Sequence, residues 1–482
     1  MMVFPKNFLW GGATSAGQYE GGYDLDGRGL SHMDYIRFLP RIDNQEHRVL
    51  NVSAEQYEAY KHREHYNFPF RRGTDFYHRY KEDIALMKEL GFKTYRMSIN
   101  WSRLYPTGME EKPLKEGVDF YHRVFDELKK ANIEPLVTMT HYDIPAYLTE
   151  TYNGWEHPIM VKLWTRFSTF LLEEYQHDVK YWLTFNEINM ICNAPYLGGG
   201  VFVEKSKKNR LSVIHQALHH MFIASALTVD YAHQHTPGAM VGNMICRLLN
   251  YAYTCKPADQ LAVLKDNQLN LFFEDVMARG YYPQYILNYY QDNDVRIDYY
   301  DQYEDILKKG TVDFLSFSYY FTSVISDDED KREKMGTFVR TLKNPYLDLT
   351  EWGWATDPTG LRIALNDLYD RYQKPLFVVE NGLGALDEMT NGNIHDSYRI
   401  EYLRQHIEAI GKAIDDGVDV MGYTIWGWID IVSMGDAQMS KRYGLVYVDA
   451  DNEGNGTYNR YKKDSFYWYQ NVIATNEEEL RD

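Results

Sequence analysis

Short hydrophobic segments and longer amphipathic segments alternate along the chain. Eight of the short segments are almost continuously hydrophobic, as strands buried on both faces of a sheet must be. They span residues 8–14, 94–99, 134–140, 181–186, 239–245, 312–319, 375–381 and 418–426. We interpret these segments as the strands of a parallel sheet, because helices cover both faces of such sheets.

The longer segments show the spacing of helices. In one of them, hydrophobic residues recur at steps of four and three, at Phe76, Tyr80, Ile84 and Met87. This spacing places them on one face of a helix, and Gly91 follows as the expected C-terminal stop. A second amphipathic segment, residues 396–417, ends at Gly417 in the same way.

Eight strands that alternate with helices predict an α/β fold in which the sheet closes into a (β/α)8 TIM barrel. A doubly wound open sheet is the alternative, but no glycine-rich phosphate loop follows any predicted strand. Polar stretches near 40–72, 324–350 and 385–396 are interpreted as long insertions in the loops between barrel elements. We therefore expect a single domain over residues 1–482.

Composition and charge narrow the class of ligand. Aromatic residues make up 15% of the chain, with 42 Tyr and 10 Trp. Such side chains pack in cores, and they also line cavities that bind amphipathic ligands such as sugars. The chain carries 51 basic and 69 acidic residues, a net charge of −18. This charge argues against a nucleic-acid partner, which requires a basic surface, so any anionic ligand must be held by a local basic site.

The sequence favours a soluble, cytoplasmic protein. Its three cysteines, Cys192, Cys246 and Cys255, form no metal-binding pattern and suit a reducing compartment. The N-terminus lacks a basic segment followed by an apolar run, and no stretch approaches the ~20 apolar residues of a membrane span. The three histidines of segment 215–220 lack the acidic partner of a metal-binding helix. We predict no metal and no membrane partner.

Two predicted strands end in a carboxylate with an amide beside it, Asn186-Glu187 and Glu380-Asn381. The active sites of barrels lie at the C-terminal ends of the strands, and an acid in such an apolar setting is costly to desolvate unless it has a partner. One such Glu could simply form an ion pair at the barrel rim. Two of them suggest glycosidic-bond cleavage, which needs one protonated and one ionised carboxyl group.

Segments along most of the chain resemble, in order, motifs of glycoside hydrolase family 1. They run from Phe8 to Asp449 and read "FLWGGATSAGQYEG", "YRMSINWSRLYPTG", "TFNE", "VVENG" and "KRYGLVYVD". This resemblance implies a retaining β-glycosidase on a (β/α)8 barrel that works without a cofactor. Retention requires the two carboxyl groups to lie about 5–5.5 Å apart.

The resemblance also implies roles for individual residues. Glu187 would be the acid/base and Glu380 the nucleophile, with Asn186 holding the 2-hydroxyl of the sugar. Tyr319, the first tyrosine of "SYY", would orient the nucleophile. We expect Glu380 to be ionised and burial to raise the pKa of Glu187. Arg96 is either a partner of these acids or a structural ion pair of the barrel.

Further residues are expected to surround the sugar. The resemblance implies a glycone subsite lined by Gln18, His141 and Trp426, and an aglycone side walled by Trp354. Packing is the alternative for Trp426 and for its neighbour Trp428, and we assign Trp426 alone to the pocket. A histidine such as His141 is also common as a hydrogen-bonded core residue.

The sequence departs from the family pattern at several positions. Ile188 replaces a usual proline, and Ser318 replaces a usual asparagine. The departure that concerns the sugar's 6-position is Ser433, which stands where plain β-glucosidases carry a Glu that grips the 4- and 6-hydroxyls of the sugar. That carboxylate would repel a 6-phosphate, whereas Ser433 can donate a hydrogen bond, Lys441 adds a charge and Tyr443 adds another donor. This Ser/Lys/Tyr set resembles the phospho-glycosidase branch of the family.

We therefore expect hydrolysis of 6-phospho-β-D-glucosides to glucose 6-phosphate and an aglycone. Met434 stands where similar 6-phospho-β-galactosidases have Trp, and its slim side chain leaves room beside the 4-hydroxyl. The alternatives are a 6-phospho-β-galactosidase, an unphosphorylated β-glucosidase and a catalytically silent sugar-phosphate sensor. Lys441 and Arg442 alone would also fit a solvated turn, and Arg442 receives no role. The aromatic content is compatible with a homo-oligomer.

Overall fold

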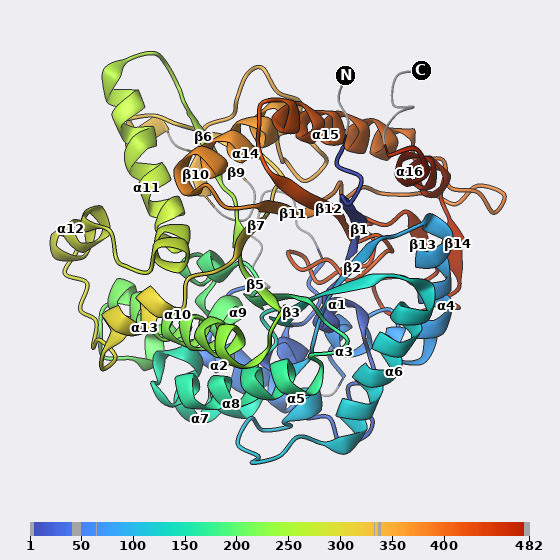
Figure 1. Cartoon of the computed structure of the whole chain (residues 1–482), viewed down its shortest axis with the longest axis horizontal. Coiled ribbons are helices and arrows are strands. Elements are labelled where there is room, and N and C mark those ends of the chain that lie inside the picture. The colour runs from blue at the N-terminus through green and yellow to red at the C-terminus, as the bar shows by residue number, and fades with distance from the viewer. Residues whose placement is uncertain (1–3, 41–49, 64, 332, 336–338, 477–482) are drawn as a thin grey trace.

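The barrel predicted from the hydrophobic pattern is confirmed. The computed structural model describes residues 4–40, 50–63, 65–331, 333–335 and 339–476. Its eight parallel strands close in the order β1-β12-β11-β7-β5-β4-β3-β2 (Figure 1). Their bounds are β1 Leu9–Ala13, β2 Thr94–Ser98, β3 Glu134–Thr140, β4 Tyr181–Phe185, β5 Met240–Cys246, β7 Phe314–Ser318, β11 Leu376–Asn381 and β12 Val420–Trp426. Each overlaps one of the eight predicted segments.

Helices surround the barrel in Figure 1. The longer ones are α4 Phe76–Leu90, α6 Lys115–Ala131, α8 Ile159–Glu174, α10 Arg210–His235, α11 Pro257–Arg279, α12 Gln284–Asp292, α14 Pro358–Tyr372, α15 Ser397–Asp415 and α16 Asp464–Thr475. Short helices occupy the loops, namely α1 Ala16–Tyr19, α2 Ala54–Lys61, α3 Pro69–Arg72, α5 Trp101–Leu104, α7 Ala146–Tyr152, α9 Pro195–Gly199 and α13 Tyr303–Lys309. Small strands outside the barrel are β6 Leu249–Ala252, β8 Thr322–Ile325, β9 Glu333–Met335, β10 Val339–Thr341, β13 Val446–Val448 and β14 Arg460–Lys462.

The helix ends follow the predicted glycine signals. Phe76, Ile84 and Met87 are buried on the inner face of α4. Gly91 ends this helix with φ 85°, a left-handed conformation that glycine adopts without steric cost. Gly417 follows α15 with φ 101°, and its N–H donates to the carbonyl of Ile414.

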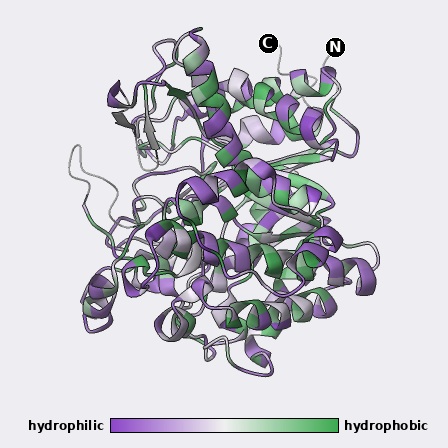
Figure 2. Cartoon of the chain, turned by 90° about the vertical axis from the view of Figure 1, so that its left-hand side faces the viewer, coloured by the Kyte–Doolittle hydropathy of each residue, from purple (hydrophilic) through white to green (hydrophobic). Residues whose placement is uncertain are grey.

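A cluster of buried side chains fills the interior of the barrel. It consists of Leu136, Leu183, Met244, Phe314, Phe377 and Val379, all contributed by barrel strands. Figure 2 shows mostly hydrophobic residues on the barrel strands, while the surrounding helices mix hydrophilic and hydrophobic residues. This plug closes the barrel, so the polar residues at the C-terminal ends of the strands form the floor of a pocket.

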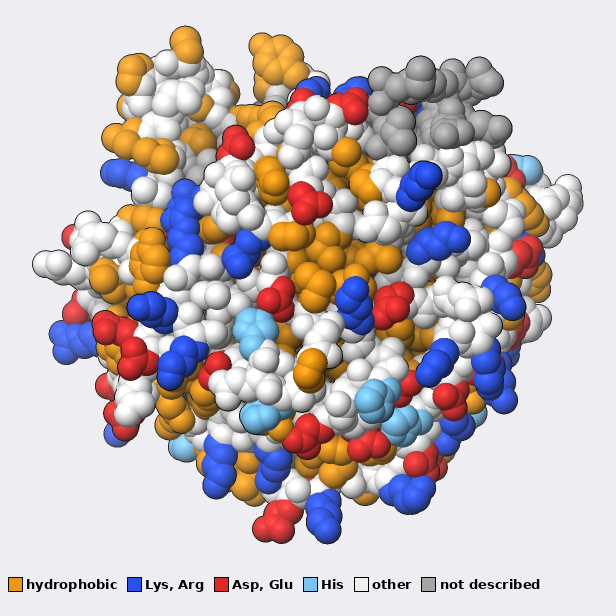
Figure 3. All heavy atoms as spheres, viewed as in Figure 1, with side chains coloured by type: hydrophobic (Ala, Val, Ile, Leu, Met, Phe, Trp, Pro, Cys, Tyr) orange, Lys and Arg blue, Asp and Glu red, His pale blue; other side chains and the backbone are white. Residues whose placement is uncertain are grey.

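Several features outside the barrel interior bear on other possible functions. Among the residues described, no helix is long and apolar enough to cross a membrane. The histidines of segment 215–220 are engaged in hydrogen bonds, His215 with Tyr290 and His219 with Tyr282. Hydrophobic side chains gather at the upper left of Figure 3, where α11 projects.

Candidate active site

A pocket opens where seven of the barrel strands end. It holds about 670 Å³ of space not filled by atoms, part of it open to solvent. Its walls come from the segments that end or follow β1, β3, β4, β5, β7, β11 and β12. Sequence segments far apart therefore meet here, and most predicted site residues line the pocket: Gln18, His141, Asn186, Glu187, Trp354, Glu380, Trp426, Met434, Lys441 and Tyr443.

Glu380 is buried in the floor of the pocket. Arg96 Nη1 contacts Glu380 Oε1, and the hydroxyl of Tyr320 donates to Oε2 over 2.9 Å. Burial raises the pKa of Glu380 to about 7, while the Arg96 charge lowers it and the charge of Glu187 raises it. The ion pair and the tyrosine together stabilise the ionised form against the cost of burial.

A β-bulge turns Glu380 into the pocket. Phe377 and Val379 face the barrel interior, so strict alternation along β11 would point Glu380 outward. The pairing of β11 with β7 shifts between Val378 and Glu380, which leaves Val379 as an extra residue. The bulge reverses the alternation, and Asn381 then faces α15, where its amide donates to the hydroxyl of Tyr402 over 3.0 Å.

Glu187 lies across the pocket in a strained backbone conformation. It follows β4 with φ 34° and ψ 60°, a left-handed conformation that costs about 1–3 kcal/mol for a residue other than glycine. The Ser318 hydroxyl donates to Glu187 Oε1 and the Tyr142 hydroxyl donates to Oε2. The side-chain contact of Ser318 is therefore with Glu187.

Arg96 joins the two sides of the site. Its Nη2 donates to Asn186 Oδ1 over 2.7 Å, while Nη1 contacts Glu380. Its Nε donates to Thr138 Oγ1 over 3.1 Å. Of the two roles left open by the sequence, the structure shows direct partnership with one of the acids, Glu380.

The structure differs from the expectation for Tyr319. The side chains of Phe314 and Ser318 face the barrel interior, so the alternation of β7 sends Tyr319 outward and brings Tyr320 into the pocket. The hydroxyl of Tyr319 donates to the carbonyl of Asp357 over 2.7 Å. Tyr320, which the sequence analysis missed, contacts Glu380 instead. The inward positions Phe314 and Ser318 were the signal that could have identified it.

The expected glycone residues share one wall. The rings of His141 and Trp426 stack with centroids 5.4 Å apart and planes 16° apart. Burial lowers the pKa of His141, and the Arg96 charge lowers it further, so its ring is neutral. Gln18 is held by a 2.8 Å hydrogen bond from its amide to the carbonyl of Val432. Trp428 packs against Phe92. It is not among the described residues that line the pocket.

Lys441 is enclosed by aromatic rings. Its Nζ lies 4.3 Å from the ring centre of Trp354, 5.0 Å from that of Trp352 and 5.6 Å from that of Tyr443. Such faces attract a cation. Trp354 therefore contacts the predicted phosphate side of the pocket as well as the space assigned to the aglycone.

Ser433 and Met434 begin the same loop. Ser433 is buried, and its hydroxyl lies close enough to Tyr443 to influence the pKa of that residue. Met434 lines the pocket beside Lys441 and Tyr443. Burial raises the pKa of Tyr443, so its hydroxyl stays protonated and available as a donor at neutral pH. Lys441 and the Tyr443 hydroxyl therefore line the same pocket as the two carboxylates, and Ser433 lies beside Tyr443.

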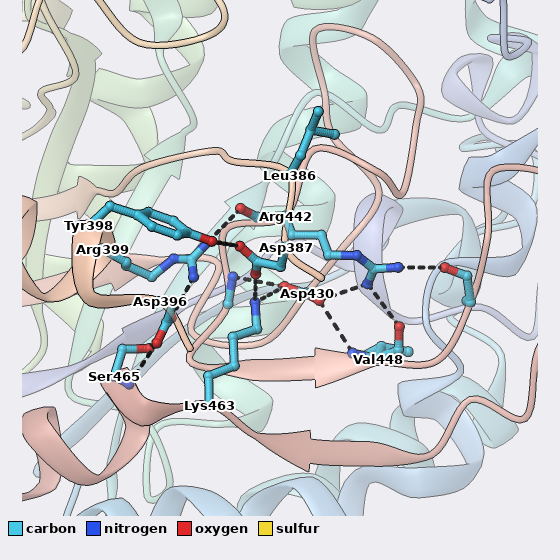
Figure 4. Close-up of polar contacts among 12 residues, drawn as sticks. Leu386, Asp387, Asp396, Tyr398, Arg399, Asp430, Arg442, Val448, Lys463 and Ser465 are labelled. Carbon is cyan, nitrogen blue, oxygen red and sulfur yellow. Dashed lines mark hydrogen bonds and ion pairs between the residues drawn. The ribbon is translucent and has the colours of Figure 1, made fainter. Parts of the chain in front are cut away.

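Arg442 points away from the pocket into a network of buried charges (Figure 4). Its guanidinium donates to Asp430 Oδ2 over 2.7 Å and to the carbonyls of Val448 and Ala450 over 2.8 and 2.9 Å. Arg442 and Lys441 are both buried. The solvated turn that their sequence also fitted is therefore wrong.

The network as a whole has no net charge. It contains three acids and three bases, namely Asp387, Asp396, Asp430, Arg399, Arg442 and Lys463. Lys463 lies between Asp387 and Asp430, and Arg399 lies between Asp387 and Asp396 (Figure 4). Burying charges is tolerable when each is paired in this way.

Backbone hydrogen bonds connect the network to the segment that follows Glu380 and to the segment that carries Lys441 and Tyr443. Ala385, which follows the strand of Glu380, and Arg442 exchange two backbone hydrogen bonds of 2.9 Å. Lys441 and Tyr443 flank Arg442 and project to the opposite side, toward the pocket. The buried charges therefore fix the backbone from which the candidate phosphate ligands project.

Comparison with known proteins agrees with this geometry. Residues 1–478 match the model of the family described as glycosyl hydrolase family 1. The chain is 48% identical to an aryl-phospho-β-D-glucosidase of Bacillus subtilis, BglH, over 99% of this chain and 98% of that protein. It is also 48% identical to the 6-phospho-β-glucosidase AscB of Escherichia coli, with 100% of both chains covered.

Solved structures give the same answer. A family 1 β-glucosidase from Thermotoga maritima superposes with a TM-score of 0.83 at 28% identity, covering 99% of this chain and 100% of the other. The family model matches nearly the whole sequence, and two relatives are 48% identical over nearly their full length. Together these matches show the family. The chain belongs to glycosyl hydrolase family 1.

Proposed function

We propose that the chain is a retaining 6-phospho-β-glucosidase, which hydrolyses 6-phospho-β-D-glucosides to glucose 6-phosphate and an aglycone. The observation that carries the proposal is the position of Lys441 and Tyr443 on the wall of the pocket that contains Glu187 and Glu380. Ser433 begins the same loop, and its buried hydroxyl lies beside Tyr443. The names of the two relatives at 48% identity support the same substrate class.

The first step uses both glutamates. Glu380 attacks the anomeric carbon while the bond from that carbon to the glycosidic oxygen breaks, and Glu187 gives its proton to the departing oxygen. The product is a covalent glycosyl ester on Glu380 and a free aglycone. Arg96 and Tyr320 contact Glu380 and hold its oxygens in position for the attack.

The second step releases the sugar. Glu187, now ionised, takes a proton from a water molecule, whose oxygen attacks the anomeric carbon and displaces Glu380. The Arg96 charge stabilises the carboxylate as it leaves. Asn186, held by Arg96, would meet the 2-hydroxyl, where hydrogen bonds strengthen in the transition state.

The phosphate would bind in the loop that follows β12. Lys441 provides the charge, while Ser433 and Tyr443 provide hydroxyl donors, and charge-assisted hydrogen bonds of this kind are about twice as strong as neutral ones. The aromatic walls reduce the solvation of Lys441, so the ammonium gains more from an anion than it would in water. Met434 lines the pocket beside Lys441 and would leave space for the equatorial 4-hydroxyl of glucose.

The test compares matched substrates. We expect aryl 6-phospho-β-glucosides to be hydrolysed at least about a hundredfold faster, in kcat/KM, than the same glucosides without phosphate. Equal rates would contradict the proposal. The galacto epimer with a 6-phosphate, measured in parallel, tests the assignment of Met434 to the 4-hydroxyl.

A further inference from the structure

A carboxylate lies inside the candidate phosphate site. Asp436 Oδ2 is 3.7 Å from Lys441 Nζ, and the two side chains are 7% and 4% exposed. The charge of Asp436 is also close enough to Tyr443 to raise the pKa of that hydroxyl, after the larger effect of burial. Asp436 therefore faces two of the groups that would hold the phosphate.

This position conflicts with the expected ligand. A sugar phosphate carries about −1.5 to −2 charges at pH 7, and like charges in a poorly solvated site repel each other strongly. A buried ammonium such as that of Lys441, however, is costly without a counter-charge. The acid satisfies Lys441 while the pocket is empty and opposes the phosphate when it arrives.

The backbone holds both partners in place. The turn around Asp436 is closed by hydrogen bonds from Ser433 N–H to the carbonyl of Gln438 over 2.8 Å and from Ala437 N–H to the carbonyl of Ser433 over 2.9 Å. Ala437 has φ 50°, a left-handed conformation that is strained for alanine. On the other side of the ion pair, the buried charges around Arg442 anchor the backbone next to Lys441 (Figure 4).

We propose that Asp436 is a specificity-determining residue, which neutralises Lys441 in the empty pocket and competes with the substrate phosphate for that ammonium. The inference rests on the proposed function. It follows that the site binds phosphate less tightly than Ser433, Lys441 and Tyr443 would without the charge of Asp436. It also follows that an unphosphorylated glucoside can enter without leaving Lys441 unpaired, so Asp436 lowers the discrimination between the two substrates.

The substitution Asp436→Asn tests the inference because it removes the charge and keeps the shape. We expect the KM for an aryl 6-phospho-β-glucoside to fall about tenfold, which corresponds to about 1.4 kcal/mol, with kcat little changed. The inhibition constant of glucose 6-phosphate should fall by a similar factor. The kcat/KM for the unphosphorylated glucoside should stay level or fall, so the ratio of the two kcat/KM values rises.

The matched control is Asp419→Asn. Asp419 is exposed and directly precedes β12, at the end of the barrel away from the pocket, so its substitution changes the net charge by the same amount. We expect it to leave both substrates unaffected. If Asp419→Asn reproduces the effect, the cause is the net charge of the protein and the role of Asp436 is refuted.

Other outcomes distinguish the role of Asp436 from the proposed function. If Asp436→Asn leaves the KM unchanged or raises it while the wild type prefers phosphorylated substrate, the inference fails and the proposed function stands. If the wild type shows no preference and no inhibition by glucose 6-phosphate, the proposed function fails. Should Asp436→Asn unfold, Asp436→Ser removes the same charge with less volume and is expected to lower the KM in the same direction.

Discussion

Arg96 and Glu380 form an ion pair at the floor of the pocket, and both side chains are almost completely buried. The same guanidinium donates to Asn186, so one side chain from β2 connects the two strand-end motifs that the sequence singled out. The pair offsets part of the burial that raises the pKa of Glu380 to about 7. The charge state of the candidate nucleophile therefore depends on Arg96.

This dependence predicts a pH effect. Glu380 must be ionised to attack, so kcat/KM of the wild type should fall below pH about 7. Because the Arg96 charge lowers the pKa of Glu380, Arg96→Met should raise it and move the acidic limb to higher pH by about one unit or more. The measurement is the pH profile of kcat/KM. An acidic limb that does not move, with activity lower at every pH, would assign Arg96 a structural role alone.

The two glutamates should respond differently to substitution. Glu380→Gln should reduce turnover at least about ten-thousandfold and leave binding of glucose 6-phosphate intact, because the nucleophile is lost and the pocket is not. Glu187→Gln should spare substrates whose leaving groups need no proton, such as highly acidic phenols. Rates for a series of aryl leaving groups check this, and a uniform loss across the series would remove Glu187 from the acid role.

Two adjacent tyrosines form a matched pair. Tyr320→Phe removes the donor to Glu380 and should lower kcat about ten- to a hundredfold with little loss of stability. Tyr319→Phe leaves the buried carbonyl of Asp357 without this donor and should cost about 1–3 kcal/mol of unfolding free energy, with kcat nearly unchanged. Kinetics and urea unfolding of both variants check the assignment. A larger kcat loss for Tyr319→Phe would reverse it.

Lys441→Ala tests the phosphate site. Loss of the ammonium should raise the KM for a phosphorylated substrate about a hundredfold, since charged hydrogen bonds in buried sites contribute about 1.5–3 kcal/mol. The unphosphorylated substrate should be affected far less. Equal losses for the two substrates would show that Lys441 supports the pocket and does not bind phosphate.

Arg442 is expected to matter for stability first. Arg442→Met leaves Asp430 with one fewer partner and removes the bonds to the carbonyls of Val448 and Ala450, so unfolding free energy should fall by about 3–5 kcal/mol. In the fraction that folds, the KM for phosphorylated substrate should rise because Lys441 and Tyr443 lose their fixed backbone. Thermal unfolding and substrate-paired kinetics measure the two effects. An unchanged stability would contradict the role of the buried charges.

Much of the architecture could be predicted from local pattern. The eight strands are hydrophobic on both faces, and the helix stops at Gly91 and Gly417 need a left-handed residue, so these features are visible in short windows of sequence. Glu187 and Glu380 stand out for the same reason, as acids at the ends of apolar strands. In these cases the physical cause lies within a few residues.

Other features depend on contacts between distant segments. The direction of Glu380 is set by a bulge against β7, and the choice between Tyr319 and Tyr320 is set by the register of that same strand. The position of Arg442 depends on its bonds to Asp430, Val448 and Ala450. The same network of charges includes the pair of Lys463 and Asp387, which are 76 residues apart in the sequence. The alternation along β7 could have indicated Tyr320, but nothing in the segments around Glu380 and Arg442 specifies the partners of those two residues.

The local sequence thus determines which helices and strands form and which side chains are chemically able to react. The folded barrel settles which of them face the pocket and which charges neutralise one another, including the pair of Asp436 with Lys441. The physical reason is that burial and electrostatic pairing are properties of three-dimensional neighbours. A sequence window shows a carboxylate and an ammonium, and only their packing makes them compete for the same ligand.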